Sequence, residues 1–210
     1  MDVEMTDRQN EIVDVSLQLI ADKGIQGFTI KNLAKKIGFT ESAVYRHFES
    51  KIEILTAILD MFKNKSAQFL THESNANVSA IAKIENLFLT HFKVFTATPS
   101  LVAVIFSEEL FRNETMLSTK VNSIMTNFAQ TLTSIIEFGQ KNGEIRSDIS
   151  AQHLATMLMD SVRMLAKQWH LSNHSFDLIL KGTEFLQSMK ILISFKSDWD
   201  RYALTFEKKF

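Results

Sequence analysis

The segment from residue 29 to residue 51 constrains the fold most, because it reads as two short helices around a glycine. Thr29 and Thr40 each precede a helix-forming stretch, and a threonine hydroxyl caps a helix by accepting a hydrogen bond from the N–H groups of its first turn. Gly38 stands between them, where a helix end takes a left-handed residue that glycine adopts at little cost. The segment therefore predicts a helix, a tight turn and a second helix.

The spacing of Ala34, Gly38 and Val44 is that of a helix-turn-helix. A small residue lets two helices cross closely, the glycine makes the turn and a β-branched residue fills the joint. Alanine and glycine recur at such a spacing by chance, so the residues that follow decide the interpretation.

Those residues, 38–54, read GFTESAVYRHFESKIEI. The run resembles the end of the DNA-binding domain of TetR-family transcriptional regulators, whose pattern is roughly Gly-Val-Ser-x-x-x-Leu-Tyr-x-His-Phe-x-Ser-Lys-Glu-x-Leu. The chain departs from this pattern at Phe39, Glu41 and Ile52. Glu41 matters most, because an acid at the start of the reading helix repels phosphate, although it can accept a hydrogen bond from a cytosine amino group. The departure affects the DNA sequence that is read, not the fold.

The resemblance implies which residues contact DNA. In the family, the start of the second helix meets base edges, while its flank and the N-terminus of the next helix meet phosphates. A helix N-terminus favours anions in any case, and Arg46 is placed for a phosphate or a guanine. Phe48 is expected to pack the small domain. The predicted DNA-contacting residues are Thr29, Thr40, Glu41, Ser42, Ala43, Tyr45, Arg46, His47 and Lys51.

Charge allows only a local DNA footprint. The whole chain carries a net charge of −1, whereas residues 23–51 carry +4 and residues 1–22 carry −5, with Arg8 as their one basic residue. We therefore expect salt-sensitive DNA binding with few contacts from an N-terminal arm. Cysteine is absent, which excludes disulfides and cysteine-type zinc sites. The acidic N-terminus is unlike a signal peptide and no apolar run could span a bilayer, so we expect a cytoplasmic protein without a membrane partner.

Low proline and glycine content, one and six residues of 210, predicts an all-α fold of about nine to ten helices. Thr6-x-x-Gln9 is a capping box that opens the first helix. We expect a three-helix DNA-binding domain over 1–52, and an effector-binding and dimerisation domain over 53–210. The helix that joins them begins at a Ser50 cap and runs to about residue 70, before a polar loop. Further helices are expected over 78–97, 99–111, 114–142, 151–169 and 176–195, with a short one in the tail, 197–210. The GEIRSD turn at 143–148 also resembles the C-terminal half of the TetR family.

Phenylalanine and methionine are abundant between residues 80 and 170, where they favour either an ordinary helical core or an adaptable cavity for an apolar effector. The resemblance adds weight to the effector cavity, since the family's C-terminal domain commonly holds a small-molecule site. A few polar residues would orient the ligand. The candidate effector-contacting residues are Phe88, His91, Phe92, Phe95, Phe106, Met125, Phe128, Met157, Asp160 and Met164.

The last two long helices are apolar on more than one face, which predicts burial on both sides and hence a partner subunit. A four-helix interface between two copies would space two recognition helices by about one DNA turn or a multiple of it. The candidate interface residues are Leu154, Leu158, Leu165, Trp169, Ile179, Phe185, Leu186, Met189 and Ile193. By contrast, His153, His170 and His174 lack the spacing of a metal site, and we expect no metal and no cofactor.

These patterns predict a homodimeric transcriptional regulator of double-stranded DNA. By resemblance it represses at a palindromic operator and is released by a small apolar effector. An alternative is a ligand-independent DNA-binding protein of the same fold that acts in chromosome organisation or cell division. No nucleophile elbow, glycine-rich phosphate loop or metal-ligand cluster occurs, so we do not expect an enzyme.

Overall fold

The computed structural model describes residues 5–107, 110 and 114–194. Over these residues every helix is an α-helix, the only β pairing is an isolated bridge between Ile145 and Ser194, and the predicted all-α fold is confirmed. In the described part of the chain, no helix is both long enough and apolar enough to cross a membrane. The predicted tail helix at 197–210 lies outside the described residues.

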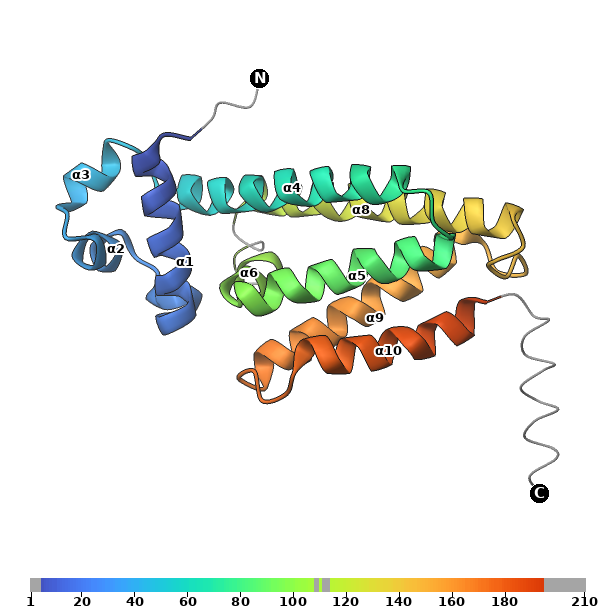
Figure 1. The fold of residues 1–210 in the computed structure, drawn as a ribbon. Coiled ribbons are helices and arrows are strands. Elements are labelled where there is room, and N and C mark those ends of the chain that lie inside the picture. The colour runs from blue at the N-terminus through green and yellow to red at the C-terminus, as the bar shows by residue number, and fades with distance from the viewer. Residues whose placement is uncertain (1–4, 108–109, 111–113, 195–210) are drawn as a thin grey trace. The chain divides into compact units, whose positions relative to one another are not determined.

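The helices follow the order expected from the sequence (Figure 1). Their bounds are α1 Asp7–Gly27, α2 Ile30–Ile37, α3 Glu41–Tyr45, α4 Lys51–Asn75, α5 Ala80–Ala97, α6 Ser100–Ile105, α8 Thr115–Lys141, α9 Ala151–Leu171 and α10 Leu178–Ile193.

Local capping chemistry sets most helix starts. Thr6 and Gln9 form the reciprocal capping box of α1, and Ser150 accepts a hydrogen bond from the backbone N–H of His153 at the start of α9. Ser50 does the same for the N–H of Glu53 at 3.1 Å. These contacts satisfy N–H groups that a helix leaves without an internal partner, and they confirm the caps predicted at Thr6 and Ser50.

Two helices end elsewhere than predicted: α4 runs beyond residue 70, and α6, which was expected over 99–111, ends at Ile105. The polar stretch expected as a loop from residue 71 is helical as far as Asn75, because it contains neither proline nor glycine and polar residues alone do not end a helix. In α1 the backbone leaves helical geometry at Gly24, with φ 69° and ψ 177°, before a last turn that ends at Gly27. Gly24 therefore interrupts α1 without ending it.

The chain divides into two compact units. The first combines Met1–Ala67 with Val94–Ile124, and the second combines Gln68–Lys93 with Met125–Phe210. In the first unit α1 packs against α2 and α6, and α2 packs against α3. Ile12, Leu33 and Val44 are fully buried there.

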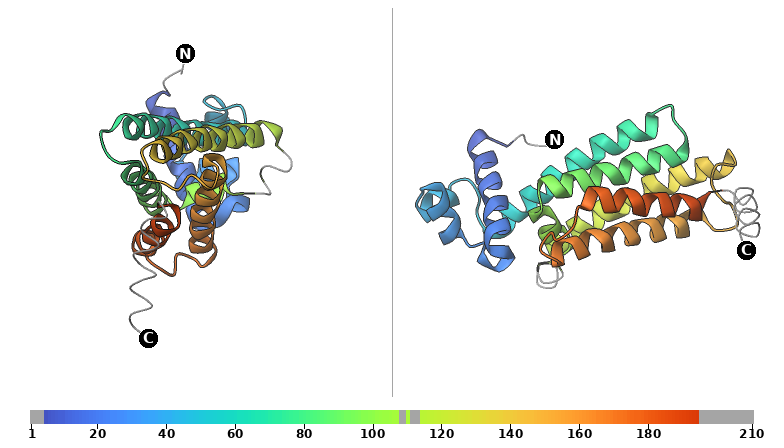
Figure 2. Two further views of the ribbon diagram at one scale, coloured as in Figure 1. Left: turned by 90° about the vertical axis from the view of Figure 1, so that its right-hand side faces the viewer. Right: turned by 60° about the horizontal axis from the view of Figure 1, so that its bottom comes forward.

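In the second unit α9 and α10 lie side by side (Figure 2). Gly182 of α10 lies directly against the ring of Phe92 on α5, since a Cβ atom added at Gly182 would stand 2.4 Å from a ring carbon. Any side chain at this position would displace the ring, so glycine permits the close approach of α10 to α5.

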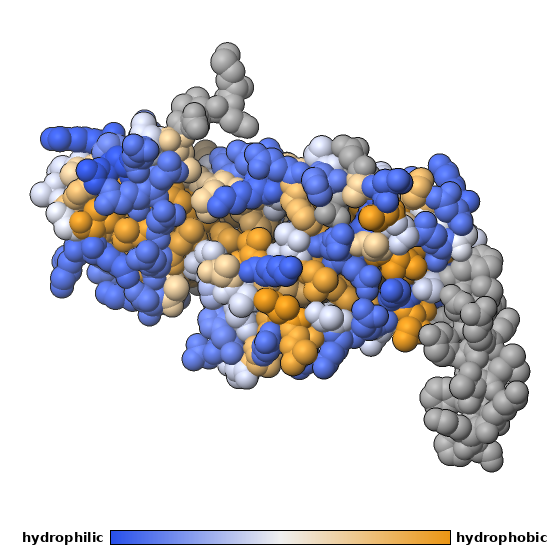
Figure 3. All heavy atoms as spheres, in the orientation of Figure 1, coloured by the Kyte–Doolittle hydropathy of each residue, from blue (hydrophilic) through white to orange (hydrophobic). Residues whose placement is uncertain are grey.

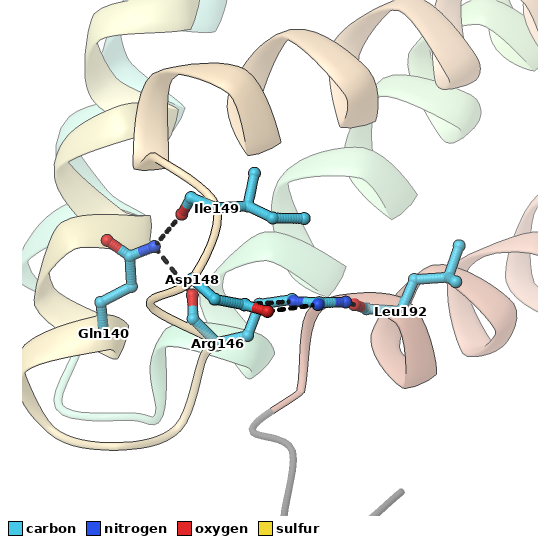
Figure 4. A network of polar contacts seen from close by, with 5 residues as sticks. All are labelled: Gln140, Arg146, Asp148, Ile149 and Leu192. Carbon is cyan, nitrogen blue, oxygen red and sulfur yellow. Dashed lines mark hydrogen bonds and ion pairs between the residues drawn. The ribbon is translucent and has the colours of Figure 1, made fainter.

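A polar cluster joins the turn after α8 to the end of α10 (Figure 4). The side-chain amide of Gln140 donates to the carbonyl oxygens of Arg146 and Ile149, both at 2.8 Å. Arg146 donates from Nε and Nη2 to the two carboxylate oxygens of Asp148, at 2.7 Å each, and from Nη1 to the carbonyl oxygen of Leu192 at 3.3 Å. The Asp148 carboxylate raises the pKa of Arg146. The GEIRSD turn is thus fixed from within and tied to the last turn of α10.

Candidate nucleic-acid interface and effector region

The short helix α3 exposes one face and buries the other. Glu41, Ser42, Tyr45 and Arg46 are exposed, whereas Val44 is fully buried. Phe48, which follows α3, is also buried, in agreement with the packing role expected for it. The exposed face carries an acid, a hydroxyl, a phenol and a guanidinium, which are the groups that read base edges and bind phosphates.

The turn into α3 has the geometry of a helix-turn-helix. Gly38 adopts φ 84° and ψ 28°, and its N–H donates to the carbonyl oxygen of Ala34. The hydroxyl of Thr40 accepts from the N–H of Ala43 at 3.2 Å, and that of Thr29 accepts from the N–H of Asn32 at 3.1 Å. Both threonines are exposed at helix N-termini, and Ala43 is half-buried.

The side chain of Lys51 is held by contacts within its own chain. Its ammonium group lies 5.4 Å from the centre of the Phe28 ring and donates to the carbonyl oxygen of Ile25 at 3.4 Å. The start of α4 is therefore fixed against the last turn of α1 and the residue that follows it. Lys36 pairs with Asp22 at 2.5 Å, so part of the positive charge of this region is balanced within the protein.

Two contacts that the sequence did not reveal join the first turn of α1 to both ends of α3. The side-chain amide of Gln9 donates to the carbonyl oxygen of His47 at 3.2 Å, and His47 is half-buried. The Arg8 guanidinium carbon lies 4.9 Å from the centre of the Phe39 ring, immediately before the Thr40 cap. The available signals were weak: Arg8 is the one basic residue of an acidic segment, and Phe39 departs from the family pattern.

The candidate effector residues fall into separate groups. In the second unit, Phe88 and Phe92 are buried, and the half-buried Phe128 ring lies 5.8 Å from Phe88 and 4.9 Å from His91. The Nδ1 atom of His91 lies 2.7 Å from the carbonyl oxygen of Leu87, and burial lowers the pKa of His91. The effector candidates Phe88, His91 and Phe128 therefore lie side by side, and their contact with a ligand stays a prediction.

A second group of rings lies in the first unit. The ring of Phe95 stacks on that of Phe62, with ring centres 6.3 Å apart, and meets the ring of Phe106 edge-on, with ring centres 6.0 Å apart. Phe106 forms the C-terminal cap position of α6, so this group borders the helix that packs against α1. Met125, the first residue of the second unit's α8 segment, is half-buried.

Three of the effector candidates need a correction. Met157, Asp160 and Met164 lie on an exposed face of α9, where Met157 and Met164 are 56% and 55% exposed. A side chain that points to solvent cannot line a cavity enclosed within one chain. The helical period allowed either face of α9 to be the inner one, and burial assigns these residues to the outer face.

The dimer candidates need the opposite correction. Six of them are already buried within one chain, so they support α9 and α10 from the inside and are not accessible to a partner. These are Leu154, Leu158, Leu165, Trp169, Leu186 and Ile193. Ile179, Phe185 and Met189 are half-buried. The exposed apolar residues of the two helices are instead Met157, Met164, Leu171, Leu180, Ile191 and Leu192.

The rings of Trp169, His170 and His174 form a small cluster at the C-terminal end of α9. The ring centres of His170 and His174 lie 5.6 Å apart, and the ring centre of Trp169 lies 4.2 Å from that of His174. Burial and the neighbouring His174 lower the pKa of His170. Over the described residues, no three histidine or acidic side chains come together as metal ligands would.

Two family models match this chain. Residues 12–58 match "Bacterial regulatory proteins, tetR family", and residues 61–192 match "YsiA-like protein, C-terminal region" of the TetR type.

Individual relatives are distant but cover most of the chain. The fatty acid metabolism regulator protein of Bacillus subtilis is 25% identical over 181 residues, which are 84% of this chain and 91% of that protein. The transcriptional repressor KstR2 of Rhodococcus jostii is 28% identical over 185 residues, 85% and 87% of the two chains. The nucleoid occlusion factor SlmA of Haemophilus influenzae is 21% identical over 156 residues, 72% of each chain.

Among solved structures, FadR from Bacillus subtilis in complex with stearoyl-CoA superimposes with a TM-score of 0.71 and 22% identity. The match covers 88% of this chain and 97% of that one. At this identity the likeness establishes the fold.

Proposed function

Because the chain belongs to the TetR family of bacterial regulatory proteins and is a transcriptional regulator, we propose that it acts as a homodimeric repressor. In this proposal the exposed face of α3 binds a palindromic DNA operator, and a small-molecule effector with an apolar part releases the protein from the DNA.

The exposed face of α3 is the observation that carries the proposal. The polar residues of this face do not contribute to the core of the unit, because Val44 and Phe48 are the residues that pack there. Arg46 is exposed at the end of the helix, where a guanidinium can bind a phosphate or the edge of a guanine. The anchored Lys51 supplies a second cation with little conformational freedom left to lose.

The dimer is proposed to form through the outer faces of α9 and α10. Met157, Met164 and Leu171 recur every seven residues, which places them along one stripe of α9. Leu180 and Ile191 are exposed on α10, and Figure 3 shows hydrophobic residues at the surface over this helix. Exposed apolar stripes of this kind mark interaction surfaces, and a two-fold axis would bring the same stripes of two copies together.

The effector is proposed to have a long or bulky apolar part. Phenylalanine rings pack against one another in each unit, Phe95 against Phe106 in the first and Phe88 against Phe128 in the second, and such side chains accept apolar ligands. The solved relative from Bacillus subtilis holds stearoyl-CoA, and another structural relative is a ketosteroid regulator. An acyl thioester or a fused-ring ketosteroid fits both this chemistry and these relatives.

A route from effector to DNA is available within the first unit. Phe95 and Phe106 meet at the C-terminal end of α6, α6 packs against α1, and Gln9 of α1 bonds to the end of α3. We propose that a ligand which separates the two rings shifts α6 and α1 together, and so favours dimers whose α3 helices no longer match the operator spacing.

A second candidate function is supported by the similarity to SlmA, a nucleoid occlusion factor. The chain would then bind DNA as a dimer without an effector and act in chromosome organisation. Release from DNA by a ligand distinguishes the two functions.

Fluorescence anisotropy tests the proposal with labelled DNA from upstream of the gene, titrated with stearoyl-CoA, a ketosteroid or acetyl-CoA at ~150 mM salt. We expect stearoyl-CoA or the ketosteroid to release the protein, and acetyl-CoA to have no effect, because an acetyl group offers almost no apolar surface to bury. The same titration with scrambled DNA controls for non-specific effects of the ligand.

Specific binding that none of the long-chain or ring ligands alters would contradict the effector part of the proposal and favour the second function. Arg46→Ala should abolish specific binding, while Lys63→Ala, which removes an exposed charge further along α4, should leave it unchanged.

A further inference from the structure

The first turn of α1 contains the only basic residue among the first 22, and that residue lies against the turn that leads into α3. The Arg8 guanidinium stands 4.9 Å from the centre of the Phe39 ring, within the range of a cation–π interaction. Thr40, which caps α3, follows Phe39 directly. A positive charge is therefore placed beside the end of α3 that carries Glu41.

The stability of α1 does not account for a cation at this position. A positive charge in the first turn is unfavourable to the helix dipole, which prefers acids there. Arg8 pairs with Glu11 three residues later, but a base that precedes its acid is the less favourable order on a helix. The Arg8 side chain remains 48% exposed and that of Glu11 44%, so their attraction is strongly screened by water.

A second contact keeps Arg8 in register with α3. Gln9, the next residue, donates to the carbonyl oxygen of His47 just beyond the C-terminal end of α3. Neighbouring side chains of one turn thus hold α3 from both ends. A guanidinium held in this way is carried with α3 when the helix enters a groove.

From these contacts we infer that Arg8 is a DNA phosphate-binding residue and that Phe39 is its positioning residue. The guanidinium carries five N–H donors in one plane, enough to bind a phosphate and a carboxylate together. It offsets the repulsion between Glu41 and the DNA backbone. Phe39, an aromatic ring where the family pattern has a small aliphatic residue, fixes the guanidinium in place. This inference rests on the proposed DNA-binding role of α3.

Salt dependence provides a test that a merely structural role would not affect. Each phosphate neutralised by the protein contributes about 0.9 to the slope of log K against log salt concentration. Binding of a labelled duplex should be measured by anisotropy across a salt series for wild type, Arg8→Ala, Phe39→Leu, Phe39→Trp and the double variant Arg8→Ala/Phe39→Leu. Lys63→Ala is the control, because Lys63 is exposed on α4 about 18 Å along the helix from Lys51.

For Arg8→Ala we expect a slope smaller by about 0.9 and a Kd raised about fivefold. Phe39→Leu should raise Kd about two- to fivefold in the wild-type background and hardly at all when Arg8 is already alanine. Phe39→Trp should bind as wild type does, since an indole holds a guanidinium at least as well. Thermal unfolding of each variant by circular dichroism shows whether the fold is kept.

The inference is overturned if Arg8→Ala matches Lys63→Ala in slope and Kd, or if it lowers the unfolding midpoint while the slope stays the same. Additive effects of the two substitutions would overturn the positioning role of Phe39. Counterion release operates on any duplex, so the slopes can also be compared on scrambled DNA. A wild-type protein with no preference for its upstream DNA would count against the proposed function and not against this inference.

Discussion

Two joints between helices in this molecule each use a glutamine and an arginine, and they use the arginine differently. At the α8–α10 joint, Gln140 holds two backbone carbonyl oxygens and three nitrogen atoms of Arg146 donate to Asp148 and Leu192 (Figure 4). At the α1–α3 joint, Gln9 holds one carbonyl oxygen and Arg8 lies over an aromatic ring.

The difference in exposure shows what each joint is for. The Arg146 side chain is 25% exposed and satisfied by acceptors of its own chain, whereas that of Arg8 is 48% exposed. The first joint is built to hold the end of α10, which borders the proposed dimer surface. The second holds α3 while it leaves a cation accessible to a partner. Substitutions at the α8–α10 joint should therefore act on stability, and substitutions at the α1–α3 joint should act mainly on DNA binding.

The largest effect is expected at Gln140. Gln140→Ala removes the donor from two partly buried carbonyl oxygens at once, and it should lower the free energy of unfolding by about 2 kcal/mol. Urea unfolding measures this loss. Gln130→Ala, an exposed position on the same helix, is the matched control and should change stability by less than about 0.5 kcal/mol. Equal losses in both variants would mean that the joint contributes nothing specific.

A smaller effect on stability is expected at Gln9, together with an effect on DNA. Gln9→Ala removes half of the capping box and the bond to His47, which should lower stability by about 1 kcal/mol and weaken DNA binding. Thr6→Ala is the control, since it removes the cap but keeps the bond to His47. If both variants bind DNA equally well, the bond between α1 and α3 does not position the recognition helix.

Substitution of the two arginines should distinguish the joints by the quantity that changes, which is stability at one joint and DNA binding at the other. Arg146→Lys cannot reproduce the two parallel bonds to Asp148, so we expect a lower unfolding midpoint and an unchanged salt slope of DNA binding. Arg8→Lys keeps the charge and should alter neither quantity strongly. A salt slope that changes with Arg146 would contradict the division of roles.

The smallest expected effect is a loss of stability at acidic pH, and it originates in the second unit. Burial lowers the pKa of His91, so below about pH 6.5 the unfolded chain takes up a proton more readily than the folded one. Stability is therefore complete above this pH and falls as the pH drops toward the lowered pKa. Urea unfolding of wild type and His91→Phe at pH 7.5 and 5.5 measures the difference. The variant should lose less stability in acid, although His170, whose pKa is also lowered, keeps part of the dependence.

Local chemistry explains what the sequence could predict. The caps at Thr6, Thr29 and Thr40 and the left-handed turn at Gly38 depend on residues within one helical turn, and the structure has all four. The resemblance to a known family added the role of the exposed face of α3, which no periodicity could provide.

Contacts distant in sequence explain what the sequence could not predict. Gln9 and His47 are 38 residues apart, and nothing in the local pattern of either segment indicates the other. The faces of α9 were misassigned for a related reason: Leu158 and Met157 both belong to apolar stripes at helical spacing, and only packing decides that the first is buried and the second exposed. An apolar stripe predicts burial against some surface, and it does not say whether that surface belongs to the same chain.

The central claim is that the exposed face of α3 recognises a specific DNA sequence. The most direct measurement is the ratio of affinities for DNA from upstream of the gene and for scrambled DNA of the same composition, at ~150 mM salt, for wild type and Arg46→Ala. The account predicts a ratio of about 10³ or more for wild type and a ratio near one for the variant. Equal affinities of the wild-type protein for both DNAs, lost together as salt rises, would contradict it.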